Sequence, residues 1–225
     1  MAWLRLLLLI LIGRPLARFL TGADVVGRER LPTKGPAIVV ANHNSHIDTL
    51  LMLALFSPRA LLKVRPAAAA DYFLADPVVS WFSRNIIGIV PVERAKAGAH
   101  ADVLAPAREA LAAGAILLIY PEGTRGAAGD VMGPLKSGVA RLAAAVPEAL
   151  VTPVWIQGAG RVLAKGDHVP VPMTCCALVG EAIHWSGDRG AFMAELKAAL
   201  DALKAEAPPL RWVDAASAPA DQTGA

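Results

Sequence analysis

The 225-residue chain has few cysteines, which form disulfide scaffolds, and few aromatic residues, which stack on the bases of nucleic acids. Its two cysteines, Cys175 and Cys176, are adjacent in an apolar run, a spacing unsuited to a disulfide framework or a metal knuckle. We expect both to be free and buried in a strand, which suggests a reducing compartment. Aromatic residues make up only 5%, and no Lys/Arg run is interleaved with them, so a nucleic-acid partner is not expected.

A long hydrophobic run is also missing at the N-terminus. The apolar stretch 6–12 is much shorter than the roughly 20 residues that cross a bilayer. No small-x-small cleavage site follows it, so we do not expect a signal peptide. With Arg5, Arg14 and Arg18 beside the apolar residues, we expect residues 1–22 to form a membrane-associated helix that lies in the interface or dips into one leaflet. The alternative is a tilted anchor whose apolar stretch continues to Leu20.

The overall composition favours a bilayer-surface protein with anionic partners. Hydrophobic residues make up 55%, which is too apolar for a typical cytosolic enzyme, and the net charge is +3. The length suits one domain.

Short apolar runs alternate with helix-type stretches after the N-terminal segment. This order predicts an α/β fold, a mixed sheet flanked by helices, over residues 23–206. Residues 207–225 are rich in Pro, Ala and Ser and are expected to form a flexible tail. The expected strands are 37–41, 86–92, 115–119, 150–156 and 174–179, and the expected helices are 47–56, 101–113, 136–145 and 192–205.

A histidine and an aspartate lie five residues apart at the first strand-to-helix corner. His43 and Asp48 can meet there, so that the carboxylate fixes the imidazole tautomer while the other ring nitrogen takes a proton. Two alternatives compete. Asp48 with Ser45 also matches a capping box at the helix start, and His46 is a rival base.

Three further motifs follow apolar runs. The sequence Pro121-Glu122-Gly123-Thr124-Arg125 predicts a sharp turn with exposed backbone N–H groups and an arginine suited to phosphate, although a plain polar turn fits as well. Arg94 ends another predicted strand and could hold a phosphate or simply be solvated. Residues 151–154 form an apolar strand with a proline, which suits the core or the wall of an acyl site.

Together these four elements resemble the four sequence blocks of the glycerolipid acyltransferases, the family that includes lysophosphatidic acid acyltransferases. The blocks are His-x4-Asp from His43 to Asp48, Gly-x5-Arg from Gly88 to Arg94, Pro-Glu-Gly-Thr-Arg from Pro121 to Arg125, and the apolar run 151–154. The resemblance covers about residues 25–185.

The resemblance implies transfer of a fatty acyl group to the free hydroxyl of a lysolipid, most simply 1-acylglycerol-3-phosphate, to give phosphatidic acid. His43 would be the base, oriented by Asp48. Arg94 and Arg125 would hold the acceptor phosphate, and Glu122 would position the glycerol or the arginine fork. The turn at Gly123 and Thr124 would add substrate contacts, and backbone N–H groups would stabilise the oxyanion.

The resemblance also implies the co-substrate. Acyl-CoA or acyl-carrier protein would be the donor, and no metal or other cofactor would be needed. The location is inferred from the residues themselves: without an expected signal peptide, with free cysteines and with a basic N-terminal flank, we expect the chain on the cytoplasmic face of the inner or plasma membrane.

One departure from the family pattern affects the acceptor. Many members have a lysine between the first two blocks, whereas this chain has alanine in the corresponding run 65–73. Lys63 and Arg65 are candidates to compensate. A phosphate-poor acceptor, such as a lyso-aminolipid, is therefore a second possibility.

Other classes fit less well. A metal hydrolase would use His43, His46 and Asp48, but no further ligand cluster is evident. A serine hydrolase lacks the Gly-x-Ser-x-Gly motif. A noncatalytic lipid-binding module would use the basic, apolar surface and would not depend on His43.

Overall fold

The centre of the molecule is a seven-stranded mixed sheet. The computed structural model describes residues 2–69, 76–92, 102–124, 126, 132–163, 167 and 169–209. The strand order is β1-β7-β6-β2-β5-β3-β4. Neighbours run parallel except β6 and β7, which are antiparallel, so the mixed sheet expected from the sequence is confirmed. The strands are β1 (Asp24–Val26), β2 (Ala37–Ala41), β3 (Val64–Ala69), β4 (Val90–Val92), β5 (Ile116–Ile119), β6 (Leu150–Gln157) and β7 (Cys176–Val179).

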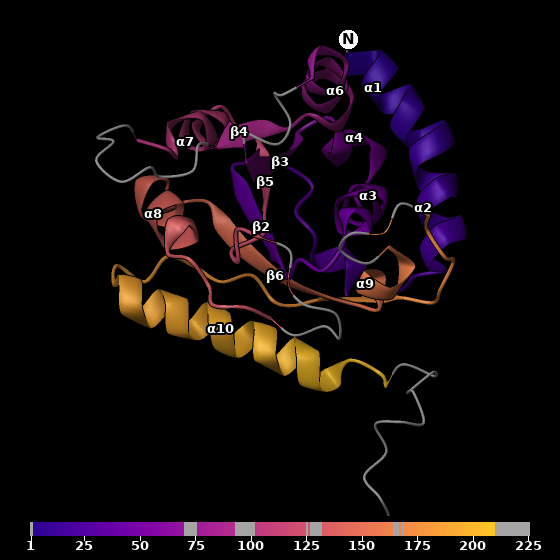
Figure 1. Cartoon of the computed structure of the whole chain (residues 1–225). Coiled ribbons are helices and arrows are strands. Elements are labelled where there is room, and N and C mark those ends of the chain that lie inside the picture. The colour runs from indigo at the N-terminus through magenta and orange to yellow at the C-terminus, as the bar shows by residue number, and fades with distance from the viewer. Residues whose placement is uncertain are drawn as a thin grey trace, which may run out of the picture.

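Helices cover both faces of this sheet (Figure 1). One layer comprises α1 (Ala2–Leu8), α2 (Arg14–Thr21), α3 (His46–Leu55), α4 (Pro58–Leu61) and α9 (Ala159–Val162). The other comprises α7 (Ala105–Ala112), α8 (Gly138–Ala145) and α10 (Arg189–Glu206). The segment between β3 and β4 forms α6 (Pro77–Phe82) and the π-helix η3 (Ser83–Ile87), which lies against α1, and a 3-10 turn, η2 (Arg28–Arg30), follows β1.

The strand pattern explains the two layers. In β2, Val39 packs in the core beneath α3, whereas Ile38 and Val40 pack on the α7, α8 and α10 side. Successive side chains of a strand point to opposite faces, so a continuous apolar strand fills two cores at once.

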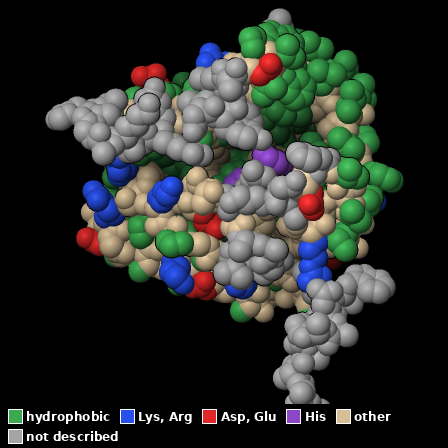
Figure 2. Space-filling view, viewed as in Figure 1, with side chains coloured by type: hydrophobic (Ala, Val, Ile, Leu, Met, Phe, Trp, Pro, Cys, Tyr) green, Lys and Arg blue, Asp and Glu red, His purple; other side chains and the backbone are tan. Residues whose placement is uncertain are grey.

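The N-terminal segment forms a helix that packs along the α3 layer. A π-helical turn, η1 (Leu9–Gly13), joins α1 to α2. Leu9, Gly13 and Ala17 recur at helical spacing and are buried. The outer face is apolar and exposed, and hydrophobic side chains gather on the same side of the molecule in Figure 2. Within the described residues, no helix combines the length and hydropathy needed to cross a membrane.

Most predicted elements are present, but one predicted strand is wrong in its first half. Residues 83–87 are helical, and the strand β4 begins only at Val90. Gly88 has a φ of 79°, a left-handed conformation that ends the helix and that glycine adopts without strain. Strands β1 and β3 were not expected. The domain limits at 22 and 206 stay predictions, and residues 210–225 of the expected tail lie outside the described part.

Candidate active site

His43 and Asp48 are paired at the carboxyl end of β2. His43 Nδ1 lies 2.9 Å from Asp48 Oδ2. Asp48 is fully buried, while the His43 side chain is 18% exposed. The buried carboxylate therefore orients an imidazole that solvent and substrate can still reach.

The capping alternative is also correct, because Asp48 fulfils both roles. Its Oδ2 accepts hydrogen bonds from the backbone N–H groups of Asn44 at 2.6 Å and Ser45 at 2.8 Å. Ser45 Oγ accepts from the N–H of Ile47, and Ser45 and Asp48 together form the capping box of α3. The helix start thus fixes the carboxylate that holds His43. The rival base, His46, is exposed on the first turn of α3.

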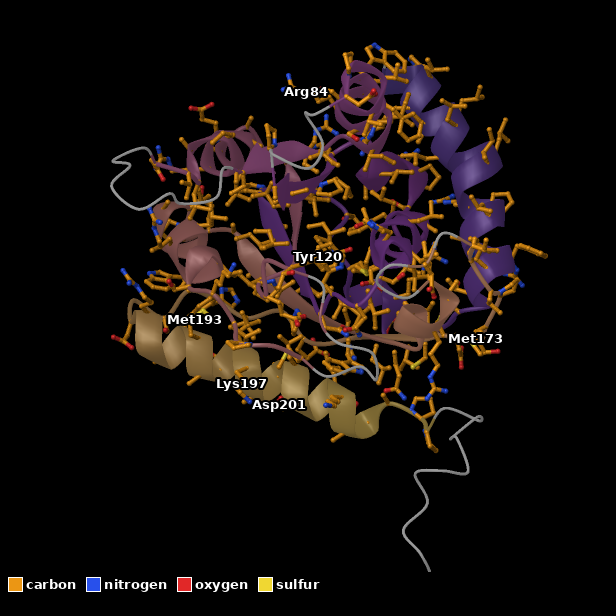
Figure 3. All side chains as sticks on the ribbon, viewed as in Figure 1. Arg84, Tyr120, Met173, Met193, Lys197 and Asp201 are labelled. Carbon is orange, nitrogen blue, oxygen red and sulfur yellow. The ribbon has the colours of Figure 1, made fainter. Side chains whose placement is uncertain are left out.

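Tyr120 supports the histidine from the end of β5, near the centre of the molecule (Figure 3). Its ring stacks on His43 with centroids 4.1 Å apart and an interplanar angle of 19°. The hydroxyl lies 3.1 Å from Thr49 Oγ1. Burial and the nearby Asp48 carboxylate raise the pKa of Tyr120 well above its usual value, so the phenol is neutral. Tyr120 directly precedes Pro121 in the sequence, but its contact with His43 is not predicted by any of the motifs.

Glu122 joins the first and third motifs. Its Oε1 accepts from the backbone N–H of His43 at 2.8 Å, and its Oε2 accepts from that of Gly133 at 2.8 Å. The side chain is buried. Glu122 therefore fixes the backbone beside the base, while its predicted contact with the glycerol or the arginine fork stays a prediction.

Asn42 fastens the same corner to β6. Its amide donates to the carbonyl of Ile156 at 2.8 Å and accepts from the N–H of Ile156 at 2.7 Å. This side chain extends the β2–β6 ladder by one residue. The His43 corner is thereby held from α3, β5 and β6.

A cavity of about 680 Å³ lies at the carboxyl ends of β3, β4 and β5, and Tyr120 and Gly123 line it. Gly123 and Thr124 are exposed. Arg94 and Arg125, the two predicted phosphate ligands, lie outside the described residues. The other lining residues are Ala67, Ala68, Ala69, Val92, Val103, Leu104, Ala107, Ile119, Pro121, Lys136, Ser137, Gly138, Val139, Arg141 and Leu142.

Lys63 and Arg65 do not line this cavity, so compensation by either residue finds no support. Both lie at the amino end of β3, whereas the cavity is at its carboxyl end. The guanidinium of Arg65 donates to the carbonyls of Leu62 and Val64.

The two cysteines are free and buried, as expected. The described part of the chain has no group of three or more His, Cys, Asp or Glu side chains placed to hold a metal ion. That the protein needs no metal stays a prediction.

The family model described as Acyltransferase matches residues 22–157, which include the His43–Asp48 pair and the Pro121–Gly123 turn. The chain belongs to the acyltransferase family. The matched segment contains every strand from β1 to β6, so the family assignment covers the site and the sheet that carries it.

Similar proteins agree with this assignment. A chloroplastic 1-acyl-sn-glycerol-3-phosphate acyltransferase of Brassica napus is 31% identical over 64% of this chain and 40% of its own length. A 1-acyl-sn-glycerol-3-phosphate acyltransferase of Pseudomonas aeruginosa is 28% identical over 81% of this chain and 67% of its own. The crystal structure of a 1-acyl-sn-glycerophosphate acyltransferase from Thermotoga maritima has a TM-score of 0.66 and 26% identity, covering 89% of this chain and 80% of that one. The chain thus spans about two fifths of the Brassica relative and most of the solved structure.

Proposed function

We propose that this acyltransferase moves a fatty acyl group from acyl-CoA or acyl-carrier protein to the free hydroxyl of 1-acylglycerol-3-phosphate, giving phosphatidic acid. The observation that carries the proposal is the oriented His43–Asp48 pair, 2.9 Å apart, beside a cavity with an apolar wall and basic side chains. The names of the Brassica and Pseudomonas relatives specify the same acceptor.

The base step follows from the geometry of the pair. With Nδ1 held by Asp48, His43 uses Nε2 to take the proton of the acceptor hydroxyl. The hydroxyl oxygen attacks the thioester carbonyl, and the carbon–sulfur bond breaks as the oxyanion collapses. The imidazolium then returns its proton to the leaving thiolate. Asp48 stabilises the imidazolium in between, and backbone N–H groups stabilise the oxyanion.

The acceptor phosphate is the proposed ligand of Arg94 and Arg125, with substrate contacts from Glu122, Gly123 and Thr124. Two described positions support this placement. Val92 and Gly123 both line the cavity, and each lies two residues before one of the arginines in the sequence. No metal or other cofactor is assigned to the reaction.

Membrane attachment through the N-terminal helix completes the proposal. Its exposed face carries Trp3, Leu7, Leu11 and Phe19. Lipid would cover these apolar side chains, and the exposed Arg18 beside Phe19 suits anionic headgroups. Arg5, by contrast, is buried and donates to backbone carbonyls of the sheet domain, so it is not placed to bind headgroups. We place the chain on the cytoplasmic face of the inner or plasma membrane.

The second candidate is the same chemistry on a phosphate-poor acceptor, such as a lyso-aminolipid. The observation that favours it is the alanine wall of the cavity at Ala67, Ala68 and Ala69. A noncatalytic lipid-binding module is the remaining alternative.

The test is acyl transfer to an acceptor panel. The full chain in vesicles is given radiolabelled acyl-CoA or acyl-carrier protein and either 1-acylglycerol-3-phosphate, a lyso-aminolipid or 1-monoacylglycerol. We expect label in phosphatidic acid. Label only in the acylated aminolipid would establish the second candidate, and absence of all products with a vesicle-bound chain would favour the binding module.

A further inference from the structure

Two basic side chains line the cavity beside Tyr120, and one of them, Lys136, has no ion-pair partner among the described residues. Lys136 and Arg141 both line the cavity. Arg141 Nη2 lies 3.4 Å from Asp102, a carboxylate that Arg108 also contacts. No described carboxylate forms an ion pair with Lys136. The charge of Lys136 is therefore available to an anion in the cavity.

Lys136 is fixed to the Pro121–Gly123 turn. Its backbone N–H donates to the carbonyl of Pro121 at 2.8 Å. Gly123 has a φ of 67°, and a methyl group there would lie only 3.0 Å from Lys136 Cε. The ammonium and the end of the aliphatic stem of the lysine thus lie against the glycine, so the charge is beside the turn that follows Tyr120.

The strand β3 supplies no charge to this cavity. This strand lines the cavity with Ala67, Ala68 and Ala69. Their methyl side chains are small, so they leave space in the cavity, and they provide no hydrogen-bond donor. Apolar side chains make most of the remaining wall, where a phosphate would need a cation to replace its hydration. A cavity of about 680 Å³ is large enough for a headgroup with part of an apolar chain.

We infer that Lys136 is a phosphate-binding residue of the acceptor site and sets the preference for a lysolipid phosphate monoester over an uncharged lysolipid. The ammonium donates to the phosphate oxygens, and the alanine face of β3 contacts the glycerol or the first part of the chain. This inference rests on the proposed function, because it assigns a residue to its acceptor.

Equilibrium binding without a donor tests Lys136 separately from catalysis. The full chain is titrated with 1-hexanoylglycerol 3-phosphate, a soluble lysolipid, and with 1-hexanoylglycerol, its phosphate-free analogue. Lys136→Met retains the stem over Gly123 and removes the charge. We expect its Kd for the phosphate compound to rise at least about 10-fold, with the analogue unaffected.

Three further variants sharpen the test. Lys63→Met removes a lysine from the opposite end of β3 and should leave both Kd values unchanged. Lys136→Arg retains the charge and should stay within about threefold of the native Kd. Adding Ala69→Lys to Lys136→Met should restore most of the phosphate affinity. Thermal unfolding of each variant verifies that it is folded.

An unchanged Kd in folded Lys136→Met, an equal loss for the phosphate-free analogue, or no phosphate binding by the native chain would overturn the inference. The proposed function can fail independently. Phosphate binding that depends on Lys136, without acyl transfer to any acceptor, would retain the site and refute the reaction. Transfer to 1-acylglycerol-3-phosphate with unchanged phosphate binding in Lys136→Met would support the reaction and refute the role of Lys136.

Discussion

At the residue scale, a single oxygen of Asp48 serves both His43 and the start of α3, and two substitutions separate these roles. Asp48→Asn retains an acceptor for the N–H groups of Asn44 and Ser45 but removes the charge that stabilises the imidazolium. We expect kcat to fall at least about 100-fold. Asp48→Ala should lose the same activity and also lower the free energy of unfolding by a further ~1 kcal/mol. Steady-state kinetics and urea unfolding measure the two effects, and an active Asp48→Asn would reduce Asp48 to a helix cap.

Tyr120 makes the free energy of unfolding depend on pH in alkaline solution. Burial, and then the Asp48 charge, raise its pKa, so the native state holds a proton that the unfolded chain releases above about pH 10. This contribution to stability is complete below that pH and is lost as the pH rises. Tyr120→Phe retains the ring stacked on His43, and we expect it to reduce the decline. Unfolding free energies of the native chain and of Tyr120→Phe at pH 9 and pH 11 test this. An equal decline between the two pH values in both proteins would contradict it.

Contacts between site residues could be predicted from the sequence only where both residues belong to the same motif. His43 and Asp48 could be paired from their spacing because both belong to one strand-to-helix corner. The contacts of Tyr120 and Glu122 with His43 depend on β5 lying beside β2, and that neighbourhood follows from the strand order rather than from any local pattern. Lys136 reaches the cavity because its backbone N–H is bonded to the carbonyl of Pro121, a contact that no local sequence pattern predicts.

At the element scale, Arg5 attaches the N-terminal helix to the sheet domain. Its buried guanidinium donates hydrogen bonds, with nitrogen–oxygen distances of 2.7 to 3.1 Å, to the carbonyls of Leu61, Val64, Ile86 and Ile87. Burial and then Arg65 lower the pKa of Arg5 to about 10, which leaves it charged at neutral pH.

Removing this contact should loosen the helix. We expect Arg5→Ala to lower the free energy of unfolding by at least about 2 kcal/mol, because four carbonyls lose their donor and three of these hydrogen bonds are buried. Arg5→Lys should not restore stability, since an ammonium cannot reproduce the guanidinium geometry. Urea unfolding measures both. Native stability in Arg5→Ala would show that apolar packing alone holds the helix.

The fold was predictable where apolar runs were regular. The expected strand 37–41 coincides with β2, and the long helix α10 extends the expected 192–205 at both ends. The strand β3, Val64–Ala69, was missed because its proline and alanines have low strand propensity. Residues 86–92 were misassigned at their start because a short apolar run fits a helix as well as a strand.

At the scale of the whole molecule, one apolar surface predicts where the chain meets lipid. It combines the outer face of the N-terminal helix with Val78, Trp81 and Phe82 of the neighbouring α6–η3 segment. We expect Leu11→Asn to weaken binding to anionic vesicles by roughly 10-fold, because Leu11 is 62% exposed on this surface. Co-sedimentation measures the change. Leu150→Asn on β6 is the matched control, and equal effects of the two substitutions would contradict this placement.

We propose His43 as the base of an acyl transfer to 1-acylglycerol-3-phosphate. The most direct test is the rate of radiolabelled phosphatidic acid formation by vesicle-bound native chain and by His43→Ala. We predict transfer by the native chain and a loss of about 1,000-fold in His43→Ala, with unchanged 1-hexanoylglycerol 3-phosphate binding to show an intact acceptor site. Native-level transfer by a folded His43→Ala would contradict the account.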